Sequence, residues 1–153
     1  MTSVNAFFYE NMTTFTYASG EKITLQVGYK TLASTHFKDE LPTPYETELA
    51  IIVIENAIED IYSKWQKVDT IITDNEQVYL MIDYFTAENQ IDSIQVERLF
   101  NRLADVISGS PKQELVFFSS PYFIATLLIL REIIHHLGIN TIKKFKAKSS
   151  FQI

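Results

Sequence analysis

The feature that most constrains the fold is a stretch of apolar side chains over residues 122–130, in which Thr126 is the one polar residue. Ser120 and Pro121 precede this stretch as a helix N-cap and a first helical residue, and Gly138 stands where a helix often ends. A helix that is apolar on all sides must be buried on all sides. We therefore expect a central helix covered by a sheet and by other helices or a partner subunit.

The same stretch is too short to cross a membrane. A bilayer span needs about 20 apolar residues, but the uncharged run from Ser119 to Leu130 is followed by Arg131 and Glu132. The N-terminal residues also lack the charged start and the long apolar segment of a signal peptide. These observations predict a cytoplasmic protein that does not interact with a membrane.

The chain has 153 residues, and 46% of them are hydrophobic. This size predicts a single globular domain over residues 1–153, with residues 146–153 as a loose C-terminal tail. The absence of cysteine excludes disulfides, zinc ribbons and cysteine nucleophiles. Four glycines leave little material for a phosphate-cradling loop or a dinucleotide fingerprint. We expect no cofactor.

Charge is unevenly distributed along the chain. The net charge is −6, and acidic residues predominate in the first 110 residues. The lysines near the C-terminus are Lys143, Lys144, Lys146 and Lys148. The acidic remainder of the chain would repel phosphates. Four lysines are also fewer basic residues than the basic patch of most nucleic-acid-binding proteins contains. We expect no nucleic-acid partner and interpret the lysines as part of a solvated terminus.

Hydrophobic periodicity predicts the element order β-β-β-α-β-β-α-β-α-β. The strands are expected at residues 6–9, 13–17, 22–29, 69–73, 78–84, 114–118 and 141–146. The helices are expected at residues 44 to 64–66, 93–108 and 121–137. Residues 31–42 and 87–91 are interpreted as connections. The last strand is placed at a sheet edge, because its lysines discourage further pairing.

Two of these helices begin with capping-box signals. In the first, Thr43 is the N-cap, Pro44 the first helical residue and Glu46 the reciprocal partner of the cap. In the second, Asp92 and Gln95 have the same spacing. These signals fix where the two helices begin.

The predicted fold class is α/β, with α+β as the alternative: a single mixed sheet with antiparallel N-terminal strands and about three helices. The element order resembles that of ribonuclease-H-like and actin-like half-domains, as an analogy of order alone. The first strand lacks the aspartate that such a nuclease uses as a metal ligand, and no phosphate-binding glycine signature is present. No family is therefore assigned.

The turn Ser119-Ser120-Pro121 is the first candidate site. Ligands of α/β proteins bind at the carboxyl ends of strands, and a helix N-terminus offers free amides and a partial positive charge to an anion. A small anionic ligand could bind there. The competing interpretation, which we favour, is that Ser120 simply caps the helix.

Asp83 is the second candidate, a carboxylate within an apolar segment predicted to be a strand. If buried, it would need hydrogen bonds or its pKa would rise, and a perturbed carboxylate in a cleft often marks a functional site. The favoured alternative is that Asp83 is partly exposed near the end of the strand.

Neither the histidines nor the acidic helix face predicts a metal site. His135 and His136 point about 100° apart on a helix, so they cannot chelate one ion together, and no carboxylate is visible at ligand spacing. They suit the last helical turn, where the helix dipole favours cations. The acidic face (Glu48, Glu55, Glu59 and Asp60) is interpreted as solvated, with docking of a basic partner as the alternative.

Two functions remain after these exclusions. The favoured prediction is a non-catalytic binding or assembly protein that self-associates or binds a protein partner, because a short chain has limited means to cover an all-apolar helix. The alternative is a small enzyme or ligand-binding domain with a pocket at Ser119, Ser120 and Asp83. No catalytic residue is assigned.

Overall fold

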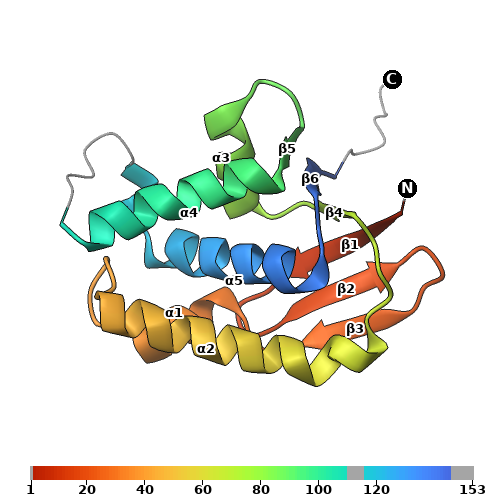
Figure 1. The fold of residues 1–153 in the computed structure, drawn as a ribbon, viewed down its shortest axis with the longest axis horizontal. Helices are drawn as coiled ribbons and strands as arrows, with labels where there is room; N and C mark the ends of the chain where they lie inside the picture. Colours follow the sequence, from red (N-terminus) through yellow and green to blue (C-terminus); the bar gives the residue numbers. More distant parts are fainter. Residues whose placement is uncertain (1, 110–115, 146–153) are drawn as a thin grey trace.

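The computed structural model describes residues 2–109 and 116–145, which form one mixed sheet with helices packed against it (Figure 1). The described strands are β1 (Ser3–Phe8), β2 (Thr13–Tyr17), β3 (Lys22–Leu25), β4 (Thr70–Thr73), β5 (Gln90–Asp92) and β6 (Thr141–Lys144). The described helices are α1 (Tyr29–His36), α2 (Pro44–Ile61), α3 (Glu76–Phe85), α4 (Ser93–Ile107) and α5 (Pro121–Leu137). Two 3₁₀ segments are η1 (Tyr62–Lys64) and η2 (Val116–Ser119).

The six described strands lie in the order β3-β2-β1-β4-β6-β5. Strands β1, β4 and β6 are parallel neighbours, whereas β2, β3 and β5 pair antiparallel to the strands beside them. The α/β class and the antiparallel N-terminal strands are therefore confirmed. The carboxyl ends of β1, β4 and β6 meet at one edge of the sheet, hereafter the carboxyl edge.

One face of the sheet forms the core beneath the helices. Its buried residues alternate along each strand and lie opposite one another across the sheet, as the two-residue period of a strand requires. They are Val4, Ala6 and Phe8 on β1, Phe15 and Tyr17 on β2, Ile23 and Leu25 on β3, Ile71 on β4, Ile91 on β5 and Ile142 on β6.

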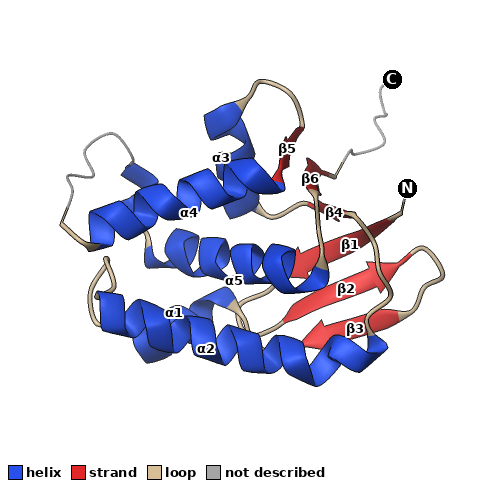
Figure 2. Cartoon of the chain, in the orientation of Figure 1, coloured by secondary structure: helices blue, strands red, loops and turns tan. Residues whose placement is uncertain are grey.

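Helix α5 lies at the centre of the molecule, as its apolar sequence predicts. It lies between α4 and α2 in front of the sheet (Figure 2), and it also contacts α1 and α3. The side chains from Phe123 to Leu130 are all buried, including Thr126, whose hydroxyl donates to the carbonyl of Tyr122 at 2.8 Å. The chain covers this helix with its own elements, so no partner subunit is needed to bury it.

Across the described residues, no helix is both long enough and apolar enough to cross a bilayer.

The helix signals in the sequence are confirmed. Thr43 and Glu46 form the reciprocal capping box of α2, with N···O distances of 3.1 and 3.0 Å. Asp92 and Gln95 do the same for α4 at 2.8 and 3.0 Å. Gly138 ends α5 with φ of 74°, a left-handed conformation that favours glycine.

The predicted strand at residues 78–84 is wrong, because this segment is α3. Asn75, which lies between the strands expected at residues 69–73 and 78–84, is the N-cap of this helix, and its Oδ1 accepts a hydrogen bond from the Val78 amide at 3.0 Å. The buried residues Val78, Met81 and Ile82 have the i, i+3, i+4 spacing of a helix face. A short apolar run is ambiguous between strand and helix, and here the cap decides.

The two predicted connections also contain regular elements. Residues 31–42 include most of α1, since β3 ends at Leu25 and the helix begins at Tyr29. Residues 87–91 include the start of β5, which has three residues. The expectation of about three helices is therefore too low, because the described residues contain five. Helix α2 ends at Ile61 and continues as η1 to Lys64.

The strand predicted at residues 114–118 is wrong for residues 116–118, the part of this segment that the structure describes. Residues 114 and 115 lie outside the described residues, and Val116–Ser119 is the 3₁₀ segment η2. The ring of Phe117 stacks on Phe123 with centroids 4.4 Å apart, and Phe118 is fully buried. The segment is therefore not a strand, and its two phenylalanine side chains pack against the first turn of α5.

The prediction that β6 is an edge strand, with a neighbour on one side only, is also wrong. This strand lies between β4 and β5, and its lysines do not prevent pairing because both side chains leave the sheet at its faces. The Nζ of Lys144 lies 2.6 Å from Asp83 and 5.0 Å from the ring centroid of Tyr79. Residues 146–153, predicted to be a loose tail, lie outside the described residues.

Candidate functional site

The carboxyl edge gathers the beginnings of three helices. Helix α3 follows β4 after two residues. The Lys30 amide of α1 donates to the Glu10 carbonyl in the β1–β2 turn at 2.9 Å. The ring of Tyr122 at the start of α5 lies 5.5 Å from that of Tyr29 on α1. Open α/β sheets usually bind ligands at this edge, and helix N-termini favour anions.

Helix α1 closes tightly on the β1–β2 turn. A Cβ atom on Gly28 would lie 2.4 Å from the Cα of Asn11, so this approach of two backbones requires glycine. The amides of Lys30 and Thr31 both donate to the Glu10 carbonyl, at 2.9 and 3.1 Å. These two amides are therefore already used by the protein, and the start of α1 has less to offer an anion.

The start of α3 is capped by its own turn. The Thr73 hydroxyl accepts from the Asn75 amide at 3.2 Å, and the Asn75 side chain accepts from the Val78 amide. Asp74 lies between them and is exposed. A carboxylate at this position opposes the binding of a second negative charge.

The two serines of the predicted site lie at the start of α5. Ser120 Oγ accepts a hydrogen bond from the Phe123 amide at 3.2 Å, so the cap interpretation is confirmed as a structural role. A hydroxyl that accepts one hydrogen bond can still donate its own hydrogen to a ligand. Ser119 ends η2 and is half-buried. The turn thus joins a 3₁₀ segment to a helix instead of a strand to a helix.

Asp83 lies on α3 and is exposed, with 56% of its side chain accessible. It accepts from Lys144 Nζ at 2.6 Å, and Lys144 ends β6 at the carboxyl edge. The strand environment that suggested a buried carboxylate is therefore absent. Asp83 instead pairs with Lys144 on the surface of α3.

The chemistry of the carboxyl edge differs from that of a glycine-rich phosphate loop. The β1–β2 turn and the β4–α3 turn contain no glycine. The charged side chains here are paired: Lys30 lies 3.8 Å from Glu10, and Lys144 lies 2.6 Å from Asp83. Hydroxyl groups, the α5 N-terminus and two lysines are the groups that could bind an anion here.

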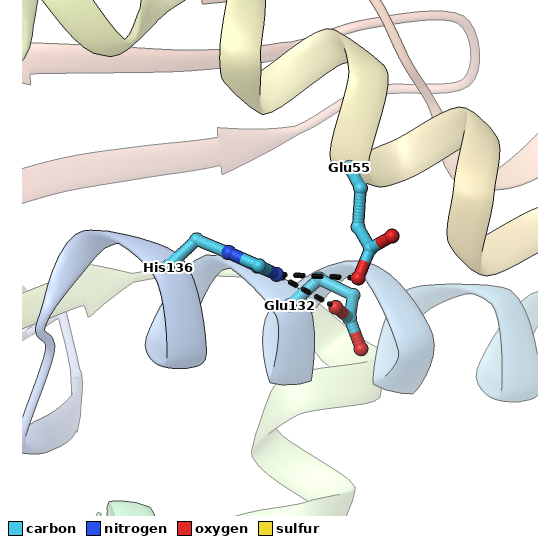
Figure 3. Close-up of side chains that lie close together, drawn as sticks. All are labelled: Glu55, Glu132 and His136. Atoms are coloured by element: carbon cyan, nitrogen blue, oxygen red, sulfur yellow. Dashed lines mark hydrogen bonds and ion pairs between the residues drawn. The ribbon is translucent and has the colours of Figure 1, made fainter.

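A second polar cluster lies at the other end of α5, where that helix approaches the amino ends of the parallel strands. His136 Nε2 lies 3.3 Å from Glu55 Oε2 and 3.3 Å from Glu132 Oε1 (Figure 3). Glu132 is 1% exposed, whereas the other two side chains are about two-fifths exposed. We call Glu55, Glu132 and His136 the carboxylate–histidine cluster. Its three ligand atoms lie within 4.8 Å of one another.

This cluster is absent from the predictions made from the sequence, in which His136 is considered only beside His135. Glu132, however, precedes His136 by four residues. Residues at i and i+4 share a helix face, so this spacing was a signal that could have been found. The third member, Glu55, is 81 residues away in sequence and comes from α2.

Arg131 connects the cluster to α4. Its guanidinium contacts Glu132 at 2.7 Å and makes a two-bond contact with Glu97 at 3.0 and 3.1 Å. It also lies 4.1 Å from the ring centroid of Phe100. The hydrogen bond from Arg131 lowers the pKa of Glu97 against the opposing effect of burial. Arg131 therefore contacts two carboxylates, Glu97 and Glu132, and Glu132 lies between this guanidinium and the imidazole of His136.

Comparison with solved structures shows which proteins share the fold. A search against protein-family models found no match, and neither did a search of curated protein sequences. A Ppx/GppA phosphatase from Aquifex aeolicus superposes with a TM-score of 0.70 at 16% sequence identity, over 93% of this chain and 52% of that one. The fold is therefore the one found in Ppx/GppA enzymes.

Other similar structures are of the same kind. An exopolyphosphatase-like protein matches with a TM-score of 0.68 at 10% identity, over 95% of this chain and 55% of that one. An exopolyphosphatase from Cytophaga hutchinsonii matches with a TM-score of 0.64 at 9% identity, over 94% and 52%. The chain spans about half the length of these structures.

These findings correct the favoured functional prediction. The prediction of a non-catalytic binding or assembly protein depends on an apolar helix that needs a partner to bury it. Helix α5 is instead buried by its own chain, and the structures that share the fold are exopolyphosphatase-type enzymes. That prediction is wrong, and the enzyme or ligand-binding alternative agrees better with the fold.

Proposed function

We propose that this chain is one domain of a phosphatase-like enzyme and binds a phosphoanion, such as a polyphosphate chain, at the carboxyl edge. The observation that carries this proposal is the likeness of more than nine-tenths of the chain to Ppx/GppA structures. Because the chain spans about half of those structures, we propose that a second domain, from the same or another polypeptide, completes the cleft.

In this proposal, the start of α5 is the main contact with the anion. The hydroxyls of Ser119 and Ser120 donate to phosphate oxygens, and the helix N-terminus adds a partial positive charge. Lys144, held by Asp83, supplies a full positive charge at the end of β6. In this proposal the serine and lysine side chains bind the phosphate oxygens, a role that backbone amides fill in proteins with glycine-rich phosphate loops.

The proposal is tested by titrating the purified chain with inorganic tripolyphosphate in a calorimeter and repeating the titration with Ser120→Asp. Aspartate still caps a helix, so folding should be preserved. A carboxylate about 4 Å from a phosphate costs about 1 kcal/mol even in water, so the affinity should fall at least about fivefold.

Ser19→Asp is the matched control. Ser19 lies in the exposed β2–β3 turn, at the opposite edge of the sheet from the start of α5. This variant adds the same charge, and tripolyphosphate affinity should change by less than about twofold at moderate salt. Equal weakening by both variants would indicate a general charge effect. No saturable binding by the unmodified chain would contradict the proposal.

A further inference from the structure

The carboxylate–histidine cluster carries more negative charge than its protein partners balance. Glu132 is 1% exposed, and its Oε2 is paired with Arg131. Arg131 makes a two-bond contact with Glu97 as well. Glu132 Oε1 lies 3.3 Å from His136 Nε2, and that imidazole also contacts Glu55 at 3.3 Å. A buried carboxylate requires compensation by a positive charge or a metal ion.

The separations between the ligand atoms suit a tetrahedral metal ion. Bonds of about 2.0–2.1 Å from Zn²⁺ to nitrogen and oxygen place neighbouring ligand atoms about 3.3–3.4 Å apart. His136 Nε2 lies 3.3 Å from an oxygen of Glu132 and 3.3 Å from an oxygen of Glu55. Small movements of the exposed Glu55 side chain would adjust the remaining oxygen–oxygen separation, which is at most 4.8 Å.

The kinds of ligand atom favour a transition metal. Mg²⁺ and Ca²⁺ prefer oxygen ligands throughout, whereas an imidazole nitrogen with carboxylate oxygens suits Zn²⁺ and its neighbours in the first transition row. Glu132 and His136 come from successive turns of one helix and Glu55 from the helix facing it, as Figure 3 shows. Two rigid elements therefore present the three ligands.

The surroundings provide both an access route and support. Glu55 and His136 line an open pocket of about 650 Å³ that also includes Glu59 and Tyr62, so a fourth ligand position faces solvent. On the inner side, Arg131 fixes Glu132 at 2.7 Å and is itself held by Glu97. Partners that orient metal ligands in this way are common in metal sites.

We propose that Glu55, Glu132 and His136 bind one divalent transition-metal ion of the Zn²⁺ type, with a solvent molecule or an anion as the fourth ligand. The site lies about 18 Å along α5 from Ser120, given a rise of about 1.5 Å per residue. It is thus separate from the carboxyl edge, and its existence does not depend on the proposed phosphoanion binding.

Calorimetric titration of the metal-free chain with Zn²⁺ tests this inference. The expected result is saturable binding of one ion per chain, with a rise in melting temperature because the ion binds the folded state. Co²⁺ bound at the same site should show the visible absorption of a four-coordinate ion. Binding should weaken more than about tenfold in His136→Ala and in Glu55→Gln, since each removes a ligand.

His135→Ala and Glu59→Gln are the matched controls. His135 is the exposed neighbour of His136 on α5, and Glu59 lines the same pocket from α2 without belonging to the cluster. Each should change Zn²⁺ affinity by less than about threefold, because only screened charge is altered. If these controls weaken binding as much as the ligand variants, the proposed ligand set is wrong.

The competing interpretation is a charged His136 that makes two ion pairs without any metal. His136→Lys keeps a cation between the carboxylates but removes the imidazole ligand. We expect this variant to fold and to lose most of its Zn²⁺ affinity. Unchanged Zn²⁺ affinity in His136→Lys, or no saturable binding by the unmodified chain, would overturn the inference.

Discussion

The two ends of α5 are held in different ways. At its amino end, Ser120 Oγ caps the helix by accepting a hydrogen bond from the Phe123 amide, three residues away, and aromatic side chains fill the space around it. At its carboxyl end, Glu132 and His136 depend on Glu55, Glu97 and Arg131, and the contacts to Glu55 and Glu97 span 81 and 34 residues.

This difference separates two kinds of polar chemistry. The polar atoms at the amino end are satisfied locally, which leaves hydroxyl hydrogens and a helix dipole for a ligand. The carboxyl end concentrates charge in a buried position, where the balance of charges matters more than any one hydrogen bond. Substitutions at the two ends should therefore change stability by different amounts, and these changes should depend differently on pH and on metal.

Phe123→Ala should have the largest effect on stability. Phe123 is fully buried beside Phe117 and Phe118 at the amino end. Truncation of such a side chain costs about 3–5 kcal/mol in the free energy of unfolding, which urea denaturation would measure. Tyr122→Ala, at a side chain that is 37% exposed, should cost about 1 kcal/mol or less. Similar costs for the two variants would mean that the amino end is not tightly packed.

Arg131→Met should cost about 3 kcal/mol in the free energy of unfolding, because it leaves the charge of Glu132 buried without its guanidinium partner. Methionine keeps an apolar contact with Phe100. The double variant Arg131→Met with Glu132→Met should recover most of the loss, since well-packed apolar residues can replace a buried pair. No recovery in the double variant would show that the charge balance at this end is not what stabilises it.

Ser120→Ala should cost about 1 kcal/mol in the free energy of unfolding, the usual loss for a helix cap, whereas Ser120→Asp should be nearly neutral. Thermal or urea denaturation at low salt would compare the three proteins. This pair separates the capping role of the side chain from any role in binding. Equal losses for alanine and aspartate would show that the cap contributes little and that the site is sterically intolerant.

Glu97→Gln should have the smallest effect, and the effect should depend on pH. The Arg131 hydrogen bond lowers the pKa of Glu97 in the folded protein, so this pair stabilises the fold above about pH 4.3 and less as the pH falls through the folded-state pKa. Because Glu97 is 40% exposed, the contribution should be less than about 1 kcal/mol. The difference from the unmodified protein should shrink in acid; a difference that grows there would contradict the assigned pairing.

Local signals in the sequence predicted much of the fold. The capping boxes at Thr43 and Asp92, the cap at Ser120 and the left-handed residue Gly138 all depend on neighbours within five residues, and each is confirmed. The central position of α5 also followed from its sequence, because a helix without a polar face has no alternative to burial.

Elements that depend on distant contacts were predicted less well. The sequence pattern predicts strands where α3 and η2 form, because short apolar runs do not distinguish a strand from a helix. Strand β5 has three residues and exists through its pairing with β6, so no local pattern identifies it.

The candidate sites also divide into those predicted by local sequence patterns and those that depend on distant contacts. Ser119, Ser120 and Asp83 could be proposed from local patterns, although Asp83 proved to lie on a helix surface beside Lys144. The carboxylate–histidine cluster required the packing of α2 on α5, which brings Glu55 to His136. Its local half, Glu132 and His136 at helical spacing, was present in the sequence.

The most direct test of the proposed carboxyl-edge site is an amide NMR titration of the chain with tripolyphosphate. We predict saturable shifts concentrated at Ser119, Ser120 and Lys144, with little change near Glu55 and His136. Shifts confined to the far end of α5, or the absence of saturable shifts, would contradict the assignment of anion binding to the carboxyl edge.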